Sequence, residues 1–156
     1  SPSQCAVADG ASLYLDRRLT QGETKDIAVA EVQDACQRAG YPDAKVEVPR
    51  YEEKAYTGKV YPTEKYYPTW VLEESSPYLK QASAAYEKVF KKNPVVDKWT
   101  FSTNAVAIAG MEGIPCLGLG PGDEVYAHAP NEACPVEHLS GAAAFYAALV
   151  AEMNGK

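Results

Sequence analysis

The apolar segment at residues 114–119 limits the possible folds of this chain more than any other feature. It follows Gly113, carries no charged side chain, and has the length of a strand that is buried on both faces. Helices must then cover both faces of the sheet. Helical patterns begin at Pro77 and at Pro135, and a strand-like segment, residues 95–101, lies between them. This order predicts an α/β fold for the second half of the chain.

The first half shows a strand–helix–strand order. Residues 12–19 alternate leucines with polar side chains, which predicts a strand with one apolar face. Thr24 can cap a helix that ends at about Ala39. Residues 44–48 alternate again and predict a second strand. A two-stranded sheet is marginal in water, so this half needs more strands than it supplies.

Residues 51–76 differ in composition from both halves. Tyrosines recur there at a spacing that fits neither a helix nor a strand, among prolines, a glycine and several charges. We expect an irregular connector whose rings either pack on a surface or line a substrate cleft. The tyrosines are Tyr51, Tyr56, Tyr61, Tyr66 and Tyr67.

Charge and composition exclude several classes of protein. The 156 residues include 15 basic and 21 acidic side chains, a formal net charge of −6. Nucleic acid and anionic membranes need clustered Lys and Arg, so neither is an expected partner. No apolar run approaches the roughly 18 residues of a membrane span. The four cysteines have neither metal-knuckle nor disulfide-scaffold spacing, which predicts free thiols and a cytoplasmic protein.

The loop between the predicted buried strand and the last helix is the strongest candidate for a site. Open α/β sheets place their sites beyond the carboxyl ends of strands, and this loop contains His128 among glycines and prolines. A loop imidazole can bind a metal or act as a general base, and the alternative is a solvated surface histidine. Cys134 and His138 offer a weaker alternative, a thiol hydrolase, because a helix N-terminus lowers a thiol pKa.

Arg18 is the second candidate. It lies on the polar face of the strand predicted at residues 12–19, beside Asp16. A guanidinium there could bind a substrate carboxylate with two hydrogen bonds. The alternative is an ordinary ion pair with Asp16.

Four motifs follow one another along the chain in a characteristic order: Asp16-x-Arg18, Ser102-Thr103-Asn104, Gly-Ile-Pro-Cys-Leu-Gly-Leu-Gly-Pro-Gly-Asp at 113–123, and His128-x-x-Asn131-Glu132. Together they resemble a family of dinuclear zinc hydrolases. The family contains acetylornithine deacetylase, succinyl-diaminopimelate desuccinylase, aminoacylase and glutamate carboxypeptidase. The resemblance covers essentially the whole chain and is nearest to the selenium-metabolism-linked hydrolase branch.

The resemblance implies an arrangement of domains. Residues 1–50 resemble the second half of a lid and dimerisation domain, the strand–helix–strand portion of a ferredoxin-like α+β fold. Residues 51–76 are the Tyr/Pro-rich connector, and residues 77–156 resemble the C-terminal part of a three-layer α/β/α catalytic domain. A homodimer through the lid is then expected, and the N-terminal half of the same enzyme would be the other partner.

The resemblance also implies roles for individual residues. His128 matches the last zinc ligand of the family, Arg18 matches the lid arginine that binds a substrate carboxylate, and Ser102, Thr103 and Asn104 match a loop that contacts substrate. This chain has Asn104 and Val106 where the commoner form of that loop has an acid and an arginine. No catalytic residue matches within the chain, because the general-base glutamate and the other ligands of the family lie upstream.

The expected activity is hydrolysis of an amide bond in an N-acyl amino acid or small peptide by a metal-activated water. The family uses two zinc ions per complete site, and cobalt or manganese can replace them. One histidine cannot hold a catalytic zinc, which needs about three protein ligands, so the chain alone is expected to be inactive. The alternative function is a non-catalytic association module whose edge strand pairs with another chain.

Overall fold

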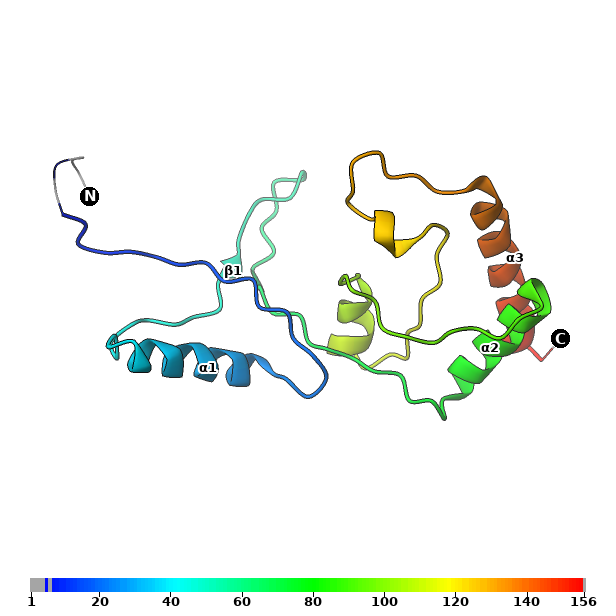
Figure 1. The fold of residues 1–156 in the computed structure, drawn as a ribbon, viewed down its shortest axis with the longest axis horizontal. Helices are drawn as coiled ribbons and strands as arrows, with labels where there is room; N and C mark the ends of the chain where they lie inside the picture. Colours follow the sequence, from blue (N-terminus) through cyan, green and yellow to red (C-terminus); the bar gives the residue numbers. More distant parts are fainter. Residues whose placement is uncertain (1–4, 6, 156) are drawn as a thin grey trace. The chain divides into compact units, whose positions relative to one another are not determined.

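Figure 1 shows the fold in a computed structural model, which describes Cys5 and residues 7–155. The chain forms two compact units, Ser1–Lys65 and Tyr66–Lys156, and the boundary falls within residues 51–76. The described residues contain three α-helices, one two-stranded sheet, one π-helix and one 3₁₀ turn. None of the described helices combines the length and the apolar character needed to cross a membrane.

The first unit contains the first predicted helix, α1 (Lys25–Arg38). Thr24 is its N-cap, and the Thr24 side chain accepts a hydrogen bond from the Ile27 N–H at 3.3 Å. Gly40, which follows the C-cap Ala39, has a φ of 89°, a conformation that a residue with a Cβ adopts only with strain. The predicted N-terminal cap and the helix that follows it are therefore confirmed.

A small antiparallel hairpin follows α1 and begins one residue before the segment predicted to be an irregular connector, residues 51–76. Strand β1 (Arg50–Tyr51) pairs with β2 (Thr63–Glu64), and Arg50 lies opposite Glu64. An isolated antiparallel bridge extends the pairing toward the tip of the hairpin. The Lys25 ammonium, in the first turn of α1, lies 2.9 Å from the Glu64 carboxylate. This ion pair connects the helix to the hairpin.

The strands predicted at residues 12–19 and 44–48 do not form. Neither segment pairs with another strand in the described part of the chain. Leu13 is 83% exposed, although the predicted pattern buries it. The second segment keeps the expected alternation, since Val46 and Val48 are half-buried between exposed neighbours. A strand needs a neighbour for its backbone N–H and C=O groups, and the described residues provide none at these positions.

The second unit is built on two packed helices, α2 (Pro77–Phe90) and α3 (Val136–Met153), which lie side by side in Figure 1. Both helices are predicted from the sequence, as is the position of Ser76 as the N-cap of α2. Phe145 of α3 is 2% exposed and packs against two alanines of α2. Partly buried apolar residues surround this core: Tyr86, Phe90, Leu117, Leu119, Ala148 and Leu149.

The strands predicted at residues 95–101 and 114–119 also do not form within the described residues. Residues Leu117 and Leu119 still pack against the helical core, and the Tyr146 hydroxyl of α3 donates a hydrogen bond to the Leu119 carbonyl. The apolar run is therefore a segment that packs on α2 and α3, not a strand buried in a sheet. Its apolar composition correctly predicted partial burial of some of its side chains, but strand pairing needs neighbours that the described chain does not place beside it.

Two short helical elements that the sequence analysis does not predict lie in the same region. They are the π-helix η1 (Val106–Met111) and the 3₁₀ turn η2 (Glu124–Tyr126). A Cβ on Gly110 would lie 2.7 Å from the Pro68 carbonyl oxygen, so only glycine permits this close approach. Isolated π-helical turns are rare and occur frequently at functional sites.

The described chain therefore combines helices with a small two-stranded sheet, so both helices and strands are present as the predicted α/β class requires, but the strands are not the predicted ones. The partial ferredoxin-like lid and the three-layer α/β/α arrangement stay predictions. Both require a larger sheet than the two short strands of the described residues.

Candidate functional site

His128 lies in the loop between η2 and α3, and hydrogen bonds within the loop fix its backbone. Its φ is 60° and that of Asn131 is 62°, so both residues adopt the left-handed conformation, which is uncommon outside glycine although His and Asn adopt it more often than other residues. The His128 N–H donates a hydrogen bond to Glu132 Oε2 at 3.2 Å. The residue is exposed. The loop therefore presents an accessible imidazole from a constrained backbone.

Two residues that precede the predicted substrate segment at residues 102–104, Thr100 and Phe101, contact η2 and the histidine loop. The Thr100 N–H donates a hydrogen bond to Glu124 Oε1 at 2.5 Å. The rings of Phe101 and His128 are 5.2 Å apart between centroids, with an angle of 72° between their planes. This is the edge-to-face arrangement that aromatic rings favour. The structure thus brings the residue directly before the predicted substrate segment into contact with His128.

The predicted substrate segment forms the entry to η1. The Ala105 N–H donates a hydrogen bond to Thr103 Oγ1 at 3.2 Å, so the threonine hydroxyl satisfies a backbone group at the start of the helix. Thr103 is half-buried, whereas Ser102 and Asn104 are exposed. Ser102 and Asn104 are therefore the members of the segment with side chains accessible to a ligand.

Arg18 belongs to the other compact unit. Its guanidinium forms an ion pair with Asp16 at 3.0 Å, and the two side chains are 71% and 74% exposed. The ion pair expected as the simpler alternative is therefore present. An exposed guanidinium has five N–H donors, so the same side chain can still bind a carboxylate.

Metal binding at His128 needs more ligands than the surrounding residues supply. A neutral imidazole is a good zinc ligand, but a catalytic zinc needs about three protein ligands. Across Cys5 and residues 7–155, no three His, Cys, Asp or Glu side chains gather closely enough to hold a metal ion. Residues beyond these would have to complete any metal site at His128.

The geometry does not support a thiol nucleophile at Cys134. The Gly122 N–H donates a hydrogen bond to His138 Nδ1 at 3.3 Å, which places the proton of the neutral ring on Nε2. A base that activates a thiol needs a free nitrogen lone pair directed at the sulfur. His138 instead connects the glycine-rich loop to α3. Cys134 is exposed, and its sulfur lies 3.6 Å from the Pro135 carbonyl oxygen.

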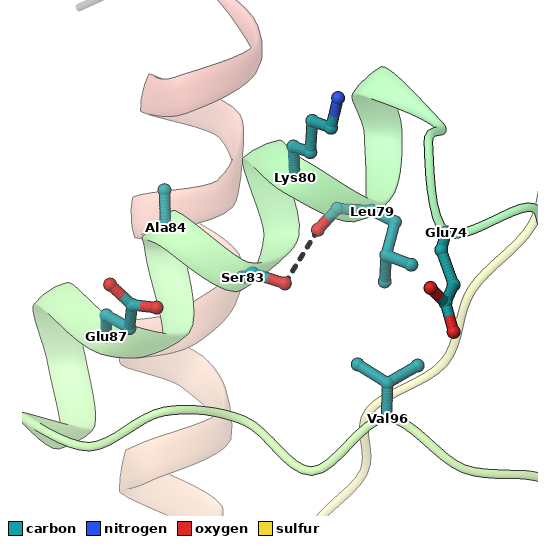
Figure 2. Close-up of a pocket in the computed structure, with 7 residues that line it drawn as sticks. All are labelled: Glu74, Leu79, Lys80, Ser83, Ala84, Glu87 and Val96. Atoms are coloured by element: carbon teal, nitrogen blue, oxygen red, sulfur yellow. Dashed lines mark hydrogen bonds between the residues drawn. The ribbon is translucent and has the colours of Figure 1, made fainter.

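A shallow pocket of about 410 Å³ lies along α2, away from the predicted site residues in the sequence. Its lining combines apolar side chains such as Leu79 and Val96 with the charged residues Lys80 and Glu87. Figure 2 shows its only hydroxyl, that of Ser83, hydrogen-bonded to the Leu79 carbonyl within the helix. Because no polar groups converge on a common point, this pocket is not a candidate for the active site.

The structure adds two residues to which the sequence analysis assigns no role. Phe101 contacts the His128 ring, and Glu132 binds the His128 backbone. Position in the sequence offers a signal for both, since Phe101 directly precedes Ser102 and Glu132 ends the His128-x-x-Asn131-Glu132 motif. Contact between the two loops is tertiary, however, and no local pattern encodes it.

A constrained loop histidine next to a polar loop is an arrangement that many hydrolases could share, so the class follows from comparison with known families. Residues 8–152 match the model of peptidase family M20/M25/M40, and the chain therefore belongs to this family of hydrolases.

Two relatives illustrate the match. The uncharacterized protein YgeY of Escherichia coli (strain K12) is 52% identical over 96% of this chain. The N-formyl-4-amino-5-aminomethyl-2-methylpyrimidine deformylase of Bacillus subtilis (strain 168) is 26% identical over 85% of this chain. The chain spans 37% of the length of the first relative and 31% of the second. No solved structure matches the chain significantly.

Proposed function

We propose that this chain is the C-terminal part of a metal-dependent amide hydrolase of the M20/M25/M40 family, nearest to the selenium-metabolism-linked branch. The substrate class is an N-acyl amino acid or a small peptide. One observation carries the proposal: the Phe101 ring lies 5.2 Å from the ring of His128, the predicted ligand, and Phe101 directly precedes the predicted substrate segment, which supports a common site for the two. The name of the Bacillus subtilis relative, a deformylase of an N-formyl compound, supports the reaction type.

Each predicted residue has a separate task in this proposal. His128 contributes one ligand to a site for zinc, cobalt or manganese that residues outside the described ones complete. Ser102, Thr103 and Asn104 hold the polar groups of the substrate beside it. Arg18 binds a substrate carboxylate, for which its exposed guanidinium has donors. The general-base glutamate lies outside this chain.

The setting of the protein is also part of the proposal. The cysteines Cys36, Cys116 and Cys134 are free thiols, which supports a reducing, cytoplasmic setting. The remaining part of the enzyme is the partner of this chain, and the first unit mediates a homodimer.

A hydrolysis screen of the complete gene product tests the reaction type. We expect turnover of at least one class among N-acyl amino acids and dipeptides, lost with a chelator and restored by zinc, cobalt or manganese. Arg18→Ala should mainly raise the KM for substrates with a free carboxylate, because the lost contact is made in both ground and transition states. Turnover that survives complete removal of metal would contradict the proposal.

A second candidate function, self-association without catalysis, is favoured by the exposed segment at residues 12–19. Leu13 and Leu15 are 83% and 59% exposed, and the segment pairs with no strand in the described chain. An unpaired segment of alternating pattern is a template for pairing with another chain. Two copies paired antiparallel, with Arg17 opposite Arg17, would place Asp16 opposite Arg18 and Leu15 opposite Leu19. The two Arg17 side chains would repel little in this register, because each is ion-paired with Glu23 and Glu31 of its own chain.

Sedimentation velocity on this chain tests that register. Asp16→Arg should disrupt the dimer, because it places arginine opposite arginine. The double variant Asp16→Arg/Arg18→Asp should restore the dimer, because it exchanges the charges but keeps their complementarity. Dimers of equal affinity in all variants, or a monomer throughout, would rule out this register.

A further inference from the structure

The imidazole of His128 is held from two directions by neighbouring residues. Glu132 holds the backbone, since its carboxylate accepts the His128 N–H at 3.2 Å. Phe101 holds the ring, through the edge-to-face contact with 5.2 Å between centroids. His128 is exposed, and without these contacts its side chain would sample several rotamers.

The backbone of the histidine loop needs such support. A non-glycine residue at a φ of 60° is uncommon, although His adopts it more often than most, and contacts with neighbouring residues stabilise it. Successive backbone hydrogen bonds, from Ala129 N–H to Tyr126 O at 3.1 Å and from Glu132 N–H to Ala129 O at 3.2 Å, fold the loop so that the Glu132 side chain returns to His128. A charged acceptor on a backbone N–H makes a stronger bond than a neutral one.

Phe101 itself has a fixed position relative to this loop. The hydrogen bond from the Thr100 N–H to Glu124 Oε1, 2.5 Å long, anchors the residue before Phe101 to the first residue of η2. The residue after Phe101 is Ser102, the first member of the predicted substrate segment. Phe101 therefore connects the substrate segment to the imidazole.

We propose that Phe101 and Glu132 are positioning residues for His128: Glu132 fixes the left-handed backbone and Phe101 fixes the orientation of the ring. The consequence for metal binding rests on the proposed function of His128 as a ligand. The positioning itself does not, because it concerns the contacts of the imidazole alone. Replacing a residue that contacts and orients a metal ligand, without itself binding the metal, typically lowers metal affinity by about 10- to 100-fold.

Nuclear magnetic resonance of this chain tests the positioning directly, because the chain has only two histidines. Phe101→Ala should shift the His128 ring protons, which lose the ring current of the phenyl group, and leave those of His138 in place. Phe101→Tyr should restore the wild-type shifts, because it keeps an aromatic ring. Val125→Ala, a change at a 72% exposed side chain in η2, is the matched control and should move neither histidine. Unchanged His128 signals in Phe101→Ala, or equal shifts of both histidines, would overturn the role of Phe101.

Glu132 requires its own pair of variants. Glu132→Ala should change the amide resonance of His128 and increase its hydrogen exchange, because the acceptor is lost. Glu132→Gln should preserve both, since the amide oxygen can still accept the bond. Equal exchange of the His128 amide in all three proteins would overturn the role of Glu132.

Zinc affinity of the complete gene product, measured against a competing chelator, tests the consequence. Phe101→Ala should weaken zinc binding by about tenfold and Phe101→Tyr should restore it. If His128→Gln leaves zinc affinity unchanged, the proposed function fails, while the magnetic resonance result still decides the positioning. If His128→Gln weakens binding and Phe101→Ala does not, the inference about positioning fails.

Discussion

The two compact units contain helices of the same length with different burial. Helices α1 and α2 each have 14 residues, yet α1 buries no side chain and α2 buries Ala82 and Ala85. The difference lies in the partner, since α2 packs against α3 and the aromatic residue Phe145 fills the contact. Helix length and capping therefore do not create a core, which requires a second element with a complementary apolar face.

The first unit relies on surface contacts in place of a core. Arg17 bonds to Glu23 at 2.5 Å and to Glu31 at 2.9 Å, and Lys25 bonds to Glu64 at 2.9 Å. Exposed ion pairs of this kind contribute about 0–1 kcal/mol each and weaken with salt. We therefore expect the first unit to unfold before the second and to depend more strongly on salt.

The largest effect should follow from replacement of Phe145. Phe145→Ala removes the only large side chain that is fully buried within the described residues, and such changes cost about 3–5 kcal/mol. Denaturant unfolding followed by hydrogen exchange should show loss of protection in α2 and α3 with α1 unaffected. Equal loss of protection in α1 would show that the two units unfold together and contradict the expectation that they unfold separately.

A smaller effect should come from Gly118 in the apolar segment. A Cβ at this position would lie 2.7 Å from Trp99 Cη2, so Gly118→Ala should displace the indole and destabilise the second unit by about 1–3 kcal/mol. Tryptophan fluorescence and thermal unfolding measure both changes. Gly120→Ala is the matched control, because a Cβ there meets nothing within 4 Å. Similar changes in the two variants would show that Trp99 does not pack on Gly118.

The N-caps of α1 and α2 differ in the same way as the two units. Thr24→Ala removes a side chain that accepts the Ile27 N–H and should destabilise α1 by about 1 kcal/mol. Ser76 occupies the same position before α2 but makes no cap hydrogen bond through its side chain, so Ser76→Ala should have almost no effect. Hydrogen exchange of the amides in α1 and α2 measures the two effects separately. A larger effect of Ser76→Ala than of Thr24→Ala would contradict the stabilising role of the Thr24 side chain.

The smallest effect should be a loss of stability of the first unit at low pH. The Thr20 backbone N–H, together with the Thr20 hydroxyl and the Arg17 guanidinium, lowers the pKa of Glu23. A lowered pKa in the folded state contributes stability above the unfolded value, about 4.3 for a glutamate, which is lost as the pH falls through the folded value. Acid titration of the first unit should therefore show a loss of Thr20 amide protection that is absent in Glu23→Gln. An identical acid profile in both proteins would remove Glu23 as its cause.

Helices were the predictable part of the fold because their signals are local. Thr24, Ser76 and Pro77 mark helix starts that the structure confirms. Strands were not predictable in the same way, because pairing depends on neighbours distant in the sequence. Residues 114–119 therefore carry a strand-like pattern but pack on helices through Leu117 and Leu119.

The sequence proposes residues for the candidate site but does not predict how they contact one another. His128 stands out among glycines and prolines in the sequence, and the substrate segment follows from the family resemblance. The contact of His128 with Phe101 and the left-handed φ of His128 depend on two loops that meet only in the folded chain. The sequence analysis does not predict η1, which starts at Val106, because a rare helix of six residues is too short to show its own period.

The most direct test of the central claim is the metal-dependent turnover of the complete gene product with and without His128. We expect His128→Ala to lower kcat/KM for the best substrate of the screen by more than about 100-fold, since loss of a ligand should exceed loss of a residue that orients one. Added zinc should restore little of it. His138→Gln, which keeps an acceptor for the Gly122 N–H, should behave like the wild type. Wild-type turnover in His128→Ala would contradict the assignment of His128 as a metal ligand in this hydrolase.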